Sequence, residues 1–255
     1  MRDRDLPLVE HLRELRQRLL VVVVALFVAT AVAFVFYQRI FDALLLPFYR
    51  AGGRELVFTD VPEMLAVTFK VCLAVGFVAA FPVLLYEAVM FAAPGLTPRE
   101  RRYLLAFLPG VLLAFAAGVA FGYFVLIPRA LRFLLTFGEG IAEPFIRIGN
   151  YVNLVTMLLF WVGVVFETPV VMFLLARLGV VDARAFGRFR PYAIVGAFVL
   201  AALITPTFDP LNQTLVAVPI VVLYEVGVQL ARLAGRRPPR RAGRRRRAVA
   251  STRPG

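Results

Sequence analysis

Residues that carry most enzyme chemistry are nearly absent from this sequence. It contains one cysteine (Cys72), one histidine (His11) and one serine (Ser251). A lone thiol forms no disulfide within the chain, and a single imidazole leaves no His-based metal site unless subunits share it. Intramembrane serine catalysis needs a buried serine beside a base, and Ser251 lies in the charged tail. The composition therefore predicts neither an enzyme nor a protein with a metal or another cofactor.

A nucleotide-binding loop is also missing, because no Gly-x-x-x-x-Gly-Lys-[Ser/Thr] pattern occurs. No nucleophile and base form a recognisable pair. The chain is thus not predicted to be a motor or a hydrolase. Any work that it performs in transport must draw on ion gradients or on partner proteins.

Long apolar runs dominate what is present. Of the 255 residues 61% are hydrophobic, and the mean hydropathy is +0.81. No Asp, Glu, Lys or Arg occurs in Leu19–Gln38, Val71–Tyr86, Leu104–Pro128 or Ile148–Phe166. About 20 apolar residues cross a hydrocarbon core about 30 Å thick. The runs meet or approach this length, so we expect an all-α integral membrane protein whose apolar surface is covered mostly by the bilayer.

The apolar runs and the breaks between them predict six transmembrane helices. Their expected bounds are 19–38, 64–88, 103–127, 148–176, 191–204 and 211–224. The last two would cover only about 21 Å each, so the bilayer is expected to be thin there or the helix ends polar. The loops 39–63 and 128–147 are long and lie on one side, and Arg129–Phe137 in the second predicts a short amphipathic helix.

Arginines indicate the orientation of these spans. The segments 1–18, 89–103 and 177–190 and the tail after Tyr224 hold 22 arginines, whereas the opposite side holds six. The positive-inside rule places the arginine-rich side in the cytoplasm. We therefore expect a multi-pass inner-membrane protein with both termini in the cytoplasm. A net charge of +13 can also indicate nucleic-acid binding. Here the arginines flank hydrophobic spans, so no nucleic-acid partner is predicted.

Composition divides the chain into three parts. Residues 1–18 are charged, and four leucines at helical spacing predict an amphipathic helix at the membrane interface. Residues 19–232 form the membrane domain. Residues 233–255 are rich in Arg and Pro and are expected to be disordered. This tail is either drawn to anionic lipid or solvated without a specific role.

An acidic residue within the fourth span is the most informative polar position. Glu167 stands in Phe166-Glu-Thr-Pro169, where a charge costs several kcal/mol and the proline is expected to kink the helix. A carboxylate beside a kink suggests a polar cavity in which Glu167 contacts a substrate or partner. Alternatively, Glu167 pairs with another helix, with Lys70, Gln213 or a tyrosine hydroxyl as candidates, or is protonated in place.

Acidic residues also lie among the arginines of the predicted cytoplasmic side. Glu10, Glu14 and Arg18 share one helix face at i, i+4 and i+8, a pattern that ordinary surface ion pairs also produce. Glu100 stands in Pro98-Arg-Glu-Arg-Arg102 beside three arginines. There the alternative is a positive-inside anchor with an incidental acid.

Two further patterns have plain structural explanations. Thr205-Pro-Thr-Phe-Asp209-Pro fits a tight turn before Gln213 in the next helix. Gly118-Val-Ala-Phe-Gly122 is a small-xxx-small pattern that permits close helix packing.

In their order along the predicted spans, several segments resemble the motifs of the TatC family, the multispanning core of the twin-arginine protein translocase. The resemblance runs from about Leu8 to Arg232. It rests on His11-Leu-Arg-Glu-Leu-Arg-Gln-Arg-Leu19, Leu46-Pro47, Tyr86 through Arg102, Phe121 through Pro128, Phe166-Glu-Thr-Pro-Val170, Arg190-Pro-Tyr192, and Thr205 through Leu215. Two positions depart from the family pattern: Val89 replaces a usual aromatic residue, and Thr205-Pro-Thr-Phe-Asp209 replaces a compact Thr-Pro-Pro-Asp.

The resemblance implies a function and a binding site. TatC-like proteins recognise signal peptides that carry consecutive arginines. With the single-span partners TatA and TatB, they export folded proteins by use of the proton motive force. On this resemblance Glu14 and Glu100 receive the twin arginines, with Arg18, Arg101 and Arg102 around them.

The resemblance also implies contacts within a concave, glove-like arrangement of the helices. It assigns Glu167 to a cavity that partner helices or the inserted signal peptide approach. Gln213, Asp209 and Pro47 join it as intramembrane polar or partner contacts. Self-association of the chain in the bilayer is expected as well.

Two other classes stay open from the residues alone. A small-solute secondary transporter would have several midplane polar residues and repeated halves. This chain offers mainly Glu167 and Lys70, with no convincing repeat. A membrane insertase or scaffold would share the basic cytoplasmic side, but it gives no reason for paired acidic sites.

Overall fold

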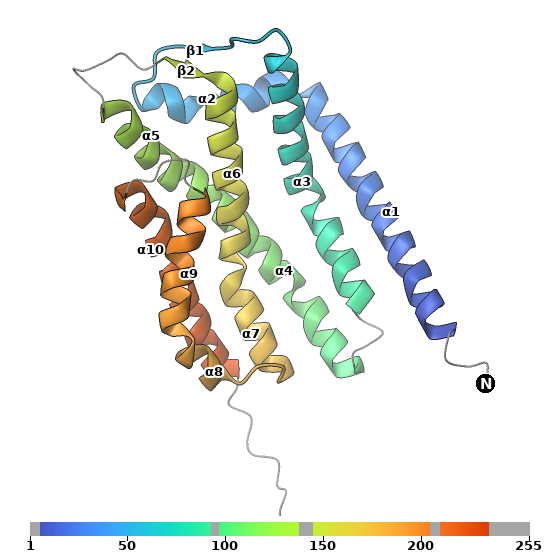
Figure 1. The fold of residues 1–255 in the computed structure, drawn as a ribbon. Helices are drawn as coiled ribbons and strands as arrows, with labels where there is room; N and C mark the ends of the chain where they lie inside the picture. The colour runs from blue at the N-terminus through green and yellow to red at the C-terminus, as the bar shows by residue number, and fades with distance from the viewer. Residues whose placement is uncertain (1–5, 93–96, 138–144, 205–209, 235–255) are drawn as a thin grey trace, which may run out of the picture.

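The structure, a computed structural model, describes residues 6–92, 97–137, 145–204 and 210–234. Long helices run side by side, and shorter elements close one end of the bundle (Figure 1). The described elements are α1 (Leu6–Val35), α2 (Tyr37–Arg50), β1 (Leu56–Val57), α3 (Glu63–Ala92), α4 (Pro98–Phe121), the π-helical segment η2 (Gly122–Leu126), α5 (Ile127–Thr136), β2 (Ile146–Arg147), α6 (Ile148–Phe166), α7 (Thr168–Leu178), α8 (Ala183–Arg188), α9 (Arg190–Ile204) and α10 (Pro210–Ala234).

The six predicted spans are present. Within the described residues five helical stretches are long and apolar enough to cross a membrane, and α9 is a shorter apolar helix. The five stretches are Glu10–Val35, Glu63–Phe91, Glu100–Thr136, Ile148–Leu178 and Gln213–Ala234. The start of α1 and the end of α10 lie at the same end of the bundle, here called the terminal end (Figure 1). The opposite end, closed by α2, α5 and the two strands, is called the cap end.

The last span differs from its prediction. Two short final helices were expected, and α9 is indeed short at 15 residues, but α10 has 25 residues and reaches Ala234. The sequence prediction ended at Tyr224 because Glu225 interrupts the apolar run. In the structure Arg190 of α9 pairs with Glu225, so this acid is neutralised and the helix continues.

Two other helices are longer than the apolar runs suggested. The charged segment before Leu19 and the first span are parts of one unbroken helix, α1. The third span continues through η2 into α5, so the helical stretch extends to Thr136. Pro128 does not end it, because this proline occupies the first turn of α5, where a missing backbone N–H is tolerated. The amphipathic helix predicted at Arg129–Phe137 corresponds to α5.

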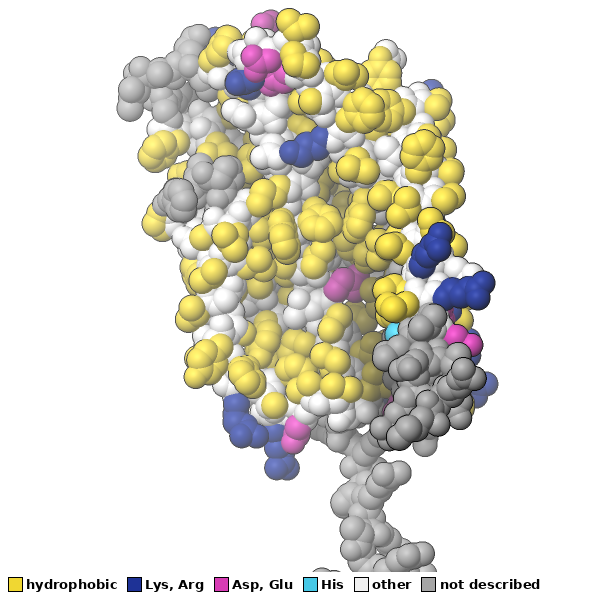
Figure 2. Space-filling model, turned by 45° about the vertical axis from the view of Figure 1, so that its right-hand side comes forward, with side chains coloured by type: hydrophobic (Ala, Val, Ile, Leu, Met, Phe, Trp, Pro, Cys, Tyr) yellow, Lys and Arg dark blue, Asp and Glu magenta, His cyan; other side chains and the backbone are white. Residues whose placement is uncertain are grey.

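The outer surface of the bundle is largely apolar. Charged side chains gather toward the two ends, and apolar side chains fill most of the band between them (Figure 2). In the first span only 6% of an 18-residue apolar stretch is buried inside the protein, whereas in the α6–α7 span the buried share of such a stretch is 39%. The α6–α7 span is thus the central helix, and α1 is a peripheral helix whose apolar faces suit lipid contact.

Close helix packing depends on two glycines. A Cβ on Gly76 of α3 would lie 2.8 Å from the backbone nitrogen of Thr30 in α1. A Cβ on Gly118 of α4 would lie 2.9 Å from Cα of Gly163 in α6. The packing explanation for the pattern from Gly118 to Gly122 is therefore confirmed, since Gly122 also faces α6 through Leu159.

The cap is fixed to the bundle by hydrogen bonds and charge pairs. The Tyr151 hydroxyl donates to the carbonyl of Leu44 in α2 at 2.7 Å. Strands β1 and β2 form a two-residue parallel pair. Next to it Arg147 contacts Glu63 at 3.0 Å and Asp60 at 2.6 Å. These hydrogen bonds, that of Glu63 first and that of Asp60 second, raise the pKa of Arg147 above its ordinary value.

Candidate functional site

A guanidinium between two carboxylates is the central feature of the terminal end. In α1 the Arg18 Nε and Nη2 atoms donate to Glu14 Oε1 at 3.0 and 2.7 Å. Its Nη1 atom donates to Glu87 Oε2 of α3 at 2.8 Å. The side chains of Arg18, Glu14 and Glu87 are 22%, 31% and 15% exposed, so the cluster is only partly screened by solvent. We call these three residues the acid–arginine cluster.

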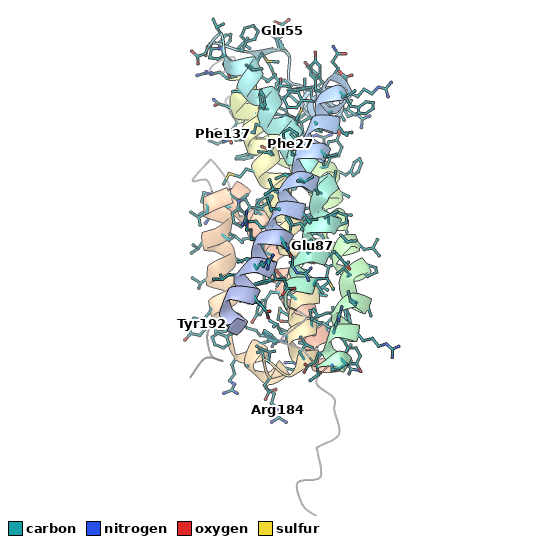
Figure 3. All side chains as sticks on the ribbon, turned by 90° about the vertical axis from the view of Figure 1, so that its right-hand side faces the viewer. Phe27, Glu55, Glu87, Phe137, Arg184 and Tyr192 are labelled. Carbon is teal, nitrogen blue, oxygen red and sulfur yellow. The ribbon has the colours of Figure 1, made fainter. Side chains whose placement is uncertain are left out.

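Glu87 was missed by the sequence analysis. It follows Tyr86 directly after an apolar run, and nothing in the local pattern connects it with residues 69 positions earlier. An acid near the end of a predicted span was the available signal. Figure 3 shows Glu87 on the side of the bundle that α1 covers, well away from Glu55 at the cap end.

Two contacts bring the ends of three helices together near the cluster. The His11 ring of α1 stacks on Phe91 of α3, with 4.5 Å between ring centroids. The Arg101 guanidinium of α4 lies 3.8 Å from the Met90 sulfur of α3. The end of α3 therefore stands between α1, which carries Glu14, and α4, which carries Glu100.

Glu100 has a structural role in the start of α4. The Thr97 backbone N–H donates to Glu100 Oε2 at 2.9 Å, and the Glu100 N–H donates to Thr97 Oγ1 at 3.4 Å. This reciprocal capping box holds the carboxylate at the first turn, where the helix dipole favours negative charge. Arg101 and Arg102 follow it and are exposed, so cationic groups surround this carboxylate.

Glu167 lies at the break between α6 and α7. The expected interruption is present, with Pro169 in the first turn of α7. Both carboxylate oxygens are buried and have no hydrogen-bond partner among the described residues. The partners considered from the sequence are engaged elsewhere: Lys70 Nζ donates to Asn153 Oδ1 at 2.5 Å, and Gln213 Nε2 donates to the Phe198 carbonyl at 2.9 Å. A buried acid without a partner is costly within the membrane, and either a contact from outside the chain or protonation in place would lower that cost.

The predicted partner contacts that the structure describes, Gln213 and Pro47, do not gather around Glu167. Gln213 joins the start of α10 to α9. Pro47 is buried inside α2 in the cap, beside a small pocket of about 190 Å³ that Tyr123 and Arg132 also line. Asp209 lies outside the described residues. The three of these residues that the structure describes, Glu167, Gln213 and Pro47, thus occupy separate places in the fold.

A second ion pair at the terminal end joins the last two helices. Arg190, in the segment that resembles a TatC motif, pairs with Glu225 of α10. The Tyr224 hydroxyl donates to the Phe186 carbonyl of α8 at 2.8 Å. These contacts fix α8, α9 and α10 to one another. Within the described residues no group of three or more His, Cys, Asp or Glu side chains could hold a metal ion.

Comparisons with known proteins identify the family of this chain. The family model for the Sec-independent protein translocase protein TatC matches residues 10–219. TatC of Aquifex aeolicus is 38% identical over 91% of this chain and 97% of its own length. TatC of Carboxydothermus hydrogenoformans is 36% identical over 91% of this chain and 95% of its own length.

The fold is shared with solved structures. The crystal structure of a twin-arginine translocase receptor, TatC, superposes with a TM-score of 0.79 at 38% sequence identity, covering 89% of this chain and all of that chain. The range matched by the family model, residues 10–219, includes the acid–arginine cluster, the Glu167 break and the cap. This chain therefore belongs to the TatC family of Sec-independent protein translocase proteins.

Proposed function

We propose that this chain is the receptor subunit of a twin-arginine translocase. In this role it recognises signal peptides with consecutive arginines at the terminal end and works with TatA- and TatB-type single-span partners. Together they export folded proteins across the cell membrane by use of the proton motive force. The excess of arginines at the terminal end supports an orientation with both termini in the cytoplasm.

The acid–arginine cluster is the observation that carries this proposal. Arg18 occupies Glu14 and Glu87 in the geometry by which carboxylates bind a guanidinium. A peptide arginine that displaced Arg18 would find the same two carboxylates already oriented. Lysine offers a compact point charge instead of a planar fork, so such a site favours Arg over Lys.

Local carboxylates are needed because the whole chain repels cations. With a net charge of +13, the long-range field opposes the approach of a dicationic peptide. We infer that the arginines of the signal peptide replace the chain's own arginines beside Glu14 and Glu100 as partners of these acids. Both sites border the end of α3, which supports one continuous peptide-binding surface.

The unpartnered Glu167 supports a contact with another membrane helix. A polar group on a partner helix, or on the inserted signal peptide, would satisfy the buried carboxylate. Association of several copies of the chain belongs to the same proposal.

Binding of paired peptides tests the receptor role. The full chain in detergent is titrated with a labelled signal peptide that contains Arg-Arg and with the same peptide containing Lys-Lys, at low and high salt. The variants are Glu14→Gln, Glu87→Gln and Glu100→Gln. Glu100→Gln is informative because glutamine also serves in a capping box, so it removes charge while α4 keeps its first turn.

Glu55→Gln is the matched control, since it removes the same charge at the cap end (Figure 3). We expect the Arg-Arg peptide to bind more tightly, and each of the three variants to reduce this preference while the control retains it. If both peptides bound equally weakly and this binding faded with salt, the interaction would be nonspecific electrostatic attraction and not recognition of arginine. That result would favour a small-solute transporter or a membrane scaffold, with Glu167 as the main candidate site.

A further inference from the structure

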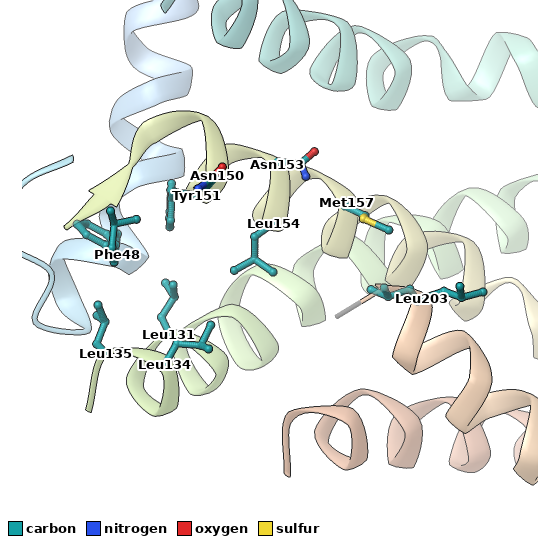
Figure 4. A pocket seen from close by; sticks show the side chains of 12 residues that line it. Phe48, Leu131, Leu134, Leu135, Asn150, Tyr151, Asn153, Leu154, Met157 and Leu203 are labelled. Atoms are coloured by element: carbon teal, nitrogen blue, oxygen red, sulfur yellow. The ribbon is translucent and has the colours of Figure 1, made fainter. Parts of the chain in front are cut away.

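A pocket at the cap end has no role in the proposed receptor function. It has a volume of about 320 Å³ and lies between α2, α5, α6 and α9 (Figure 4). Its lining is mostly apolar: Phe48, Leu131, Leu134, Leu135, Ile146, Asn150, Tyr151, Asn153, Leu154, Met157, Leu203 and Ile204. The volume falls within the range of about 300–1,000 Å³ that is typical of small-ligand sites.

The α6 side of the pocket changes from polar to apolar along its length. Asn150, Asn153, Leu154 and Met157 stand at i, i+3, i+4 and i+7, and therefore on one helix face. Both asparagines are exposed and lie nearer the cap, whereas Leu154 and Met157 lie deeper and are half-buried. This gradient suits a ligand with a polar head toward the cap and an apolar tail below it.

A cation that does not itself line the pocket is hydrogen-bonded to one of the lining residues. Lys70 is the only lysine of the chain, and its side chain is exposed. Its Nζ atom donates to Asn153 Oδ1 at 2.5 Å. Among the described residues no carboxylate pairs with it, although Arg147 at the same end has two acidic partners. An ammonium group has three donors, so Lys70 retains capacity for an anion.

The depth of Lys70 matches the level of lipid phosphates. At 1.5 Å per residue the 30 residues of α3 span about 45 Å, close to the thickness of a bilayer with its headgroups. Lys70 is seven residues from the first residue of α3, or about 10 Å below the cap end of that helix. That position lies near the boundary of the hydrocarbon core, from which a lysine side chain can reach the headgroup region.

We propose that this site binds one anionic phospholipid from the leaflet at the cap end. The phosphate group accepts hydrogen bonds from Lys70 and from the asparagine amides, and one acyl chain enters the pocket between α5, α6 and α9.

Native mass spectrometry of the full chain in detergent tests the site with two defined lipids. Phosphatidylglycerol and phosphatidylcholine of equal chain length are titrated separately, and the fraction of protein with one bound lipid is measured. One lysine near an anionic headgroup contributes a factor of about five in affinity. We expect the parent chain to prefer phosphatidylglycerol by about this factor.

Three variants separate the proposal from its competitors. Lys70→Gln should lower phosphatidylglycerol binding about fivefold, to the level of phosphatidylcholine, whereas Lys70→Arg should keep the preference. Met157→Trp, which fills the pocket, should weaken both lipids. Arg129→Gln is the matched control, because it removes an exposed cation at the same end whose guanidinium donates to the Val125 carbonyl, outside the pocket lining.

Gel filtration and melting temperature establish that each variant is folded. Equal binding of the two lipids by the parent chain would overturn the proposal. An unchanged preference in Lys70→Gln would overturn it as well, because the headgroup would then be recognised elsewhere. Since no peptide is present, failure of this experiment leaves the receptor proposal unaffected.

Discussion

Arg18 acts as an internal competitor for the ligand if the acid–arginine cluster is the peptide site. Arg18→Gln removes the guanidinium while keeping a side chain that can pack along α1. The peptide then no longer has to break the contacts of Arg18 with Glu14 and Glu87. The substitution is therefore expected to strengthen binding of an Arg-Arg peptide, although it removes native contacts between α1 and α3.

The size of this effect follows from the exposure of the cluster. Partly exposed ion pairs contribute about 0.2–1 kcal/mol each, and Arg18 makes one with each of two acids. At about 0.7 kcal/mol per pair the competitor weakens peptide binding by about 1.4 kcal/mol, which is a factor of about ten. Arg18→Gln should thus lower Kd for the Arg-Arg peptide about tenfold.

Fluorescence anisotropy with a labelled peptide measures this change. Arg13→Gln is the control, because it alters the net charge equally on an exposed position of the same helix. The gain in the control should be small and should disappear at high salt. Weaker binding in Arg18→Gln would refute the competitor role and would mean that Arg18 holds Glu14 and Glu87 in position instead.

Three further outcomes are expected. Gly76→Ala should lower stability by about 1–3 kcal/mol, because its Cβ meets the Thr30 backbone of the neighbouring helix. Gly110→Ala has open space around it and should be neutral in the same thermal unfolding assay. Arg147→Gln should open the cap to protease. Pairing raises the pKa of Arg147 in the folded protein. The stability that this pairing contributes is therefore fully present at every pH below the ordinary pKa of an arginine side chain. The difference in melting temperature from the parent should then stay constant from about pH 7 to about pH 9. Glu167→Leu should raise the melting temperature, because it removes an unpartnered buried acid. The same substitution should reduce transport of a reporter protein. An unchanged transport rate would contradict a functional contact at this position.

The number and order of the spans were predictable because each apolar run is bounded by charge or proline. The break at Glu167 was predictable as well, since Pro169 cannot continue the hydrogen-bond ladder of α6. The true end of α10 was not, because the neutralising partner of Glu225 is Arg190 on another helix. Local hydropathy cannot reveal a charge pair between residues that are 35 positions apart.

The candidate site was predictable only in part. Glu14 and Arg18 are four residues apart on one helix, so their pairing follows from helical geometry. Glu87 joins them because α1 and α3 pack closely at Gly76, which is a tertiary contact. The capping role of Glu100 could have been found from Thr97, since Thr-x-x-Glu before an apolar run is a helix-start signature.

The π-helical segment η2 lets α4 and α5 keep their packing faces although the chain between them holds one residue more than a regular α-helix. A π turn accommodates one extra residue, so removing one residue from Gly122–Leu126 should restore regular α-helix and leave Leu131 in the buried cluster that it forms with α6. Removing one residue from a regular turn of α4 would instead rotate α5 by about 100° relative to the residues before the deletion. A one-residue deletion should therefore be tolerated in η2 and should disturb the cap when it falls within α4.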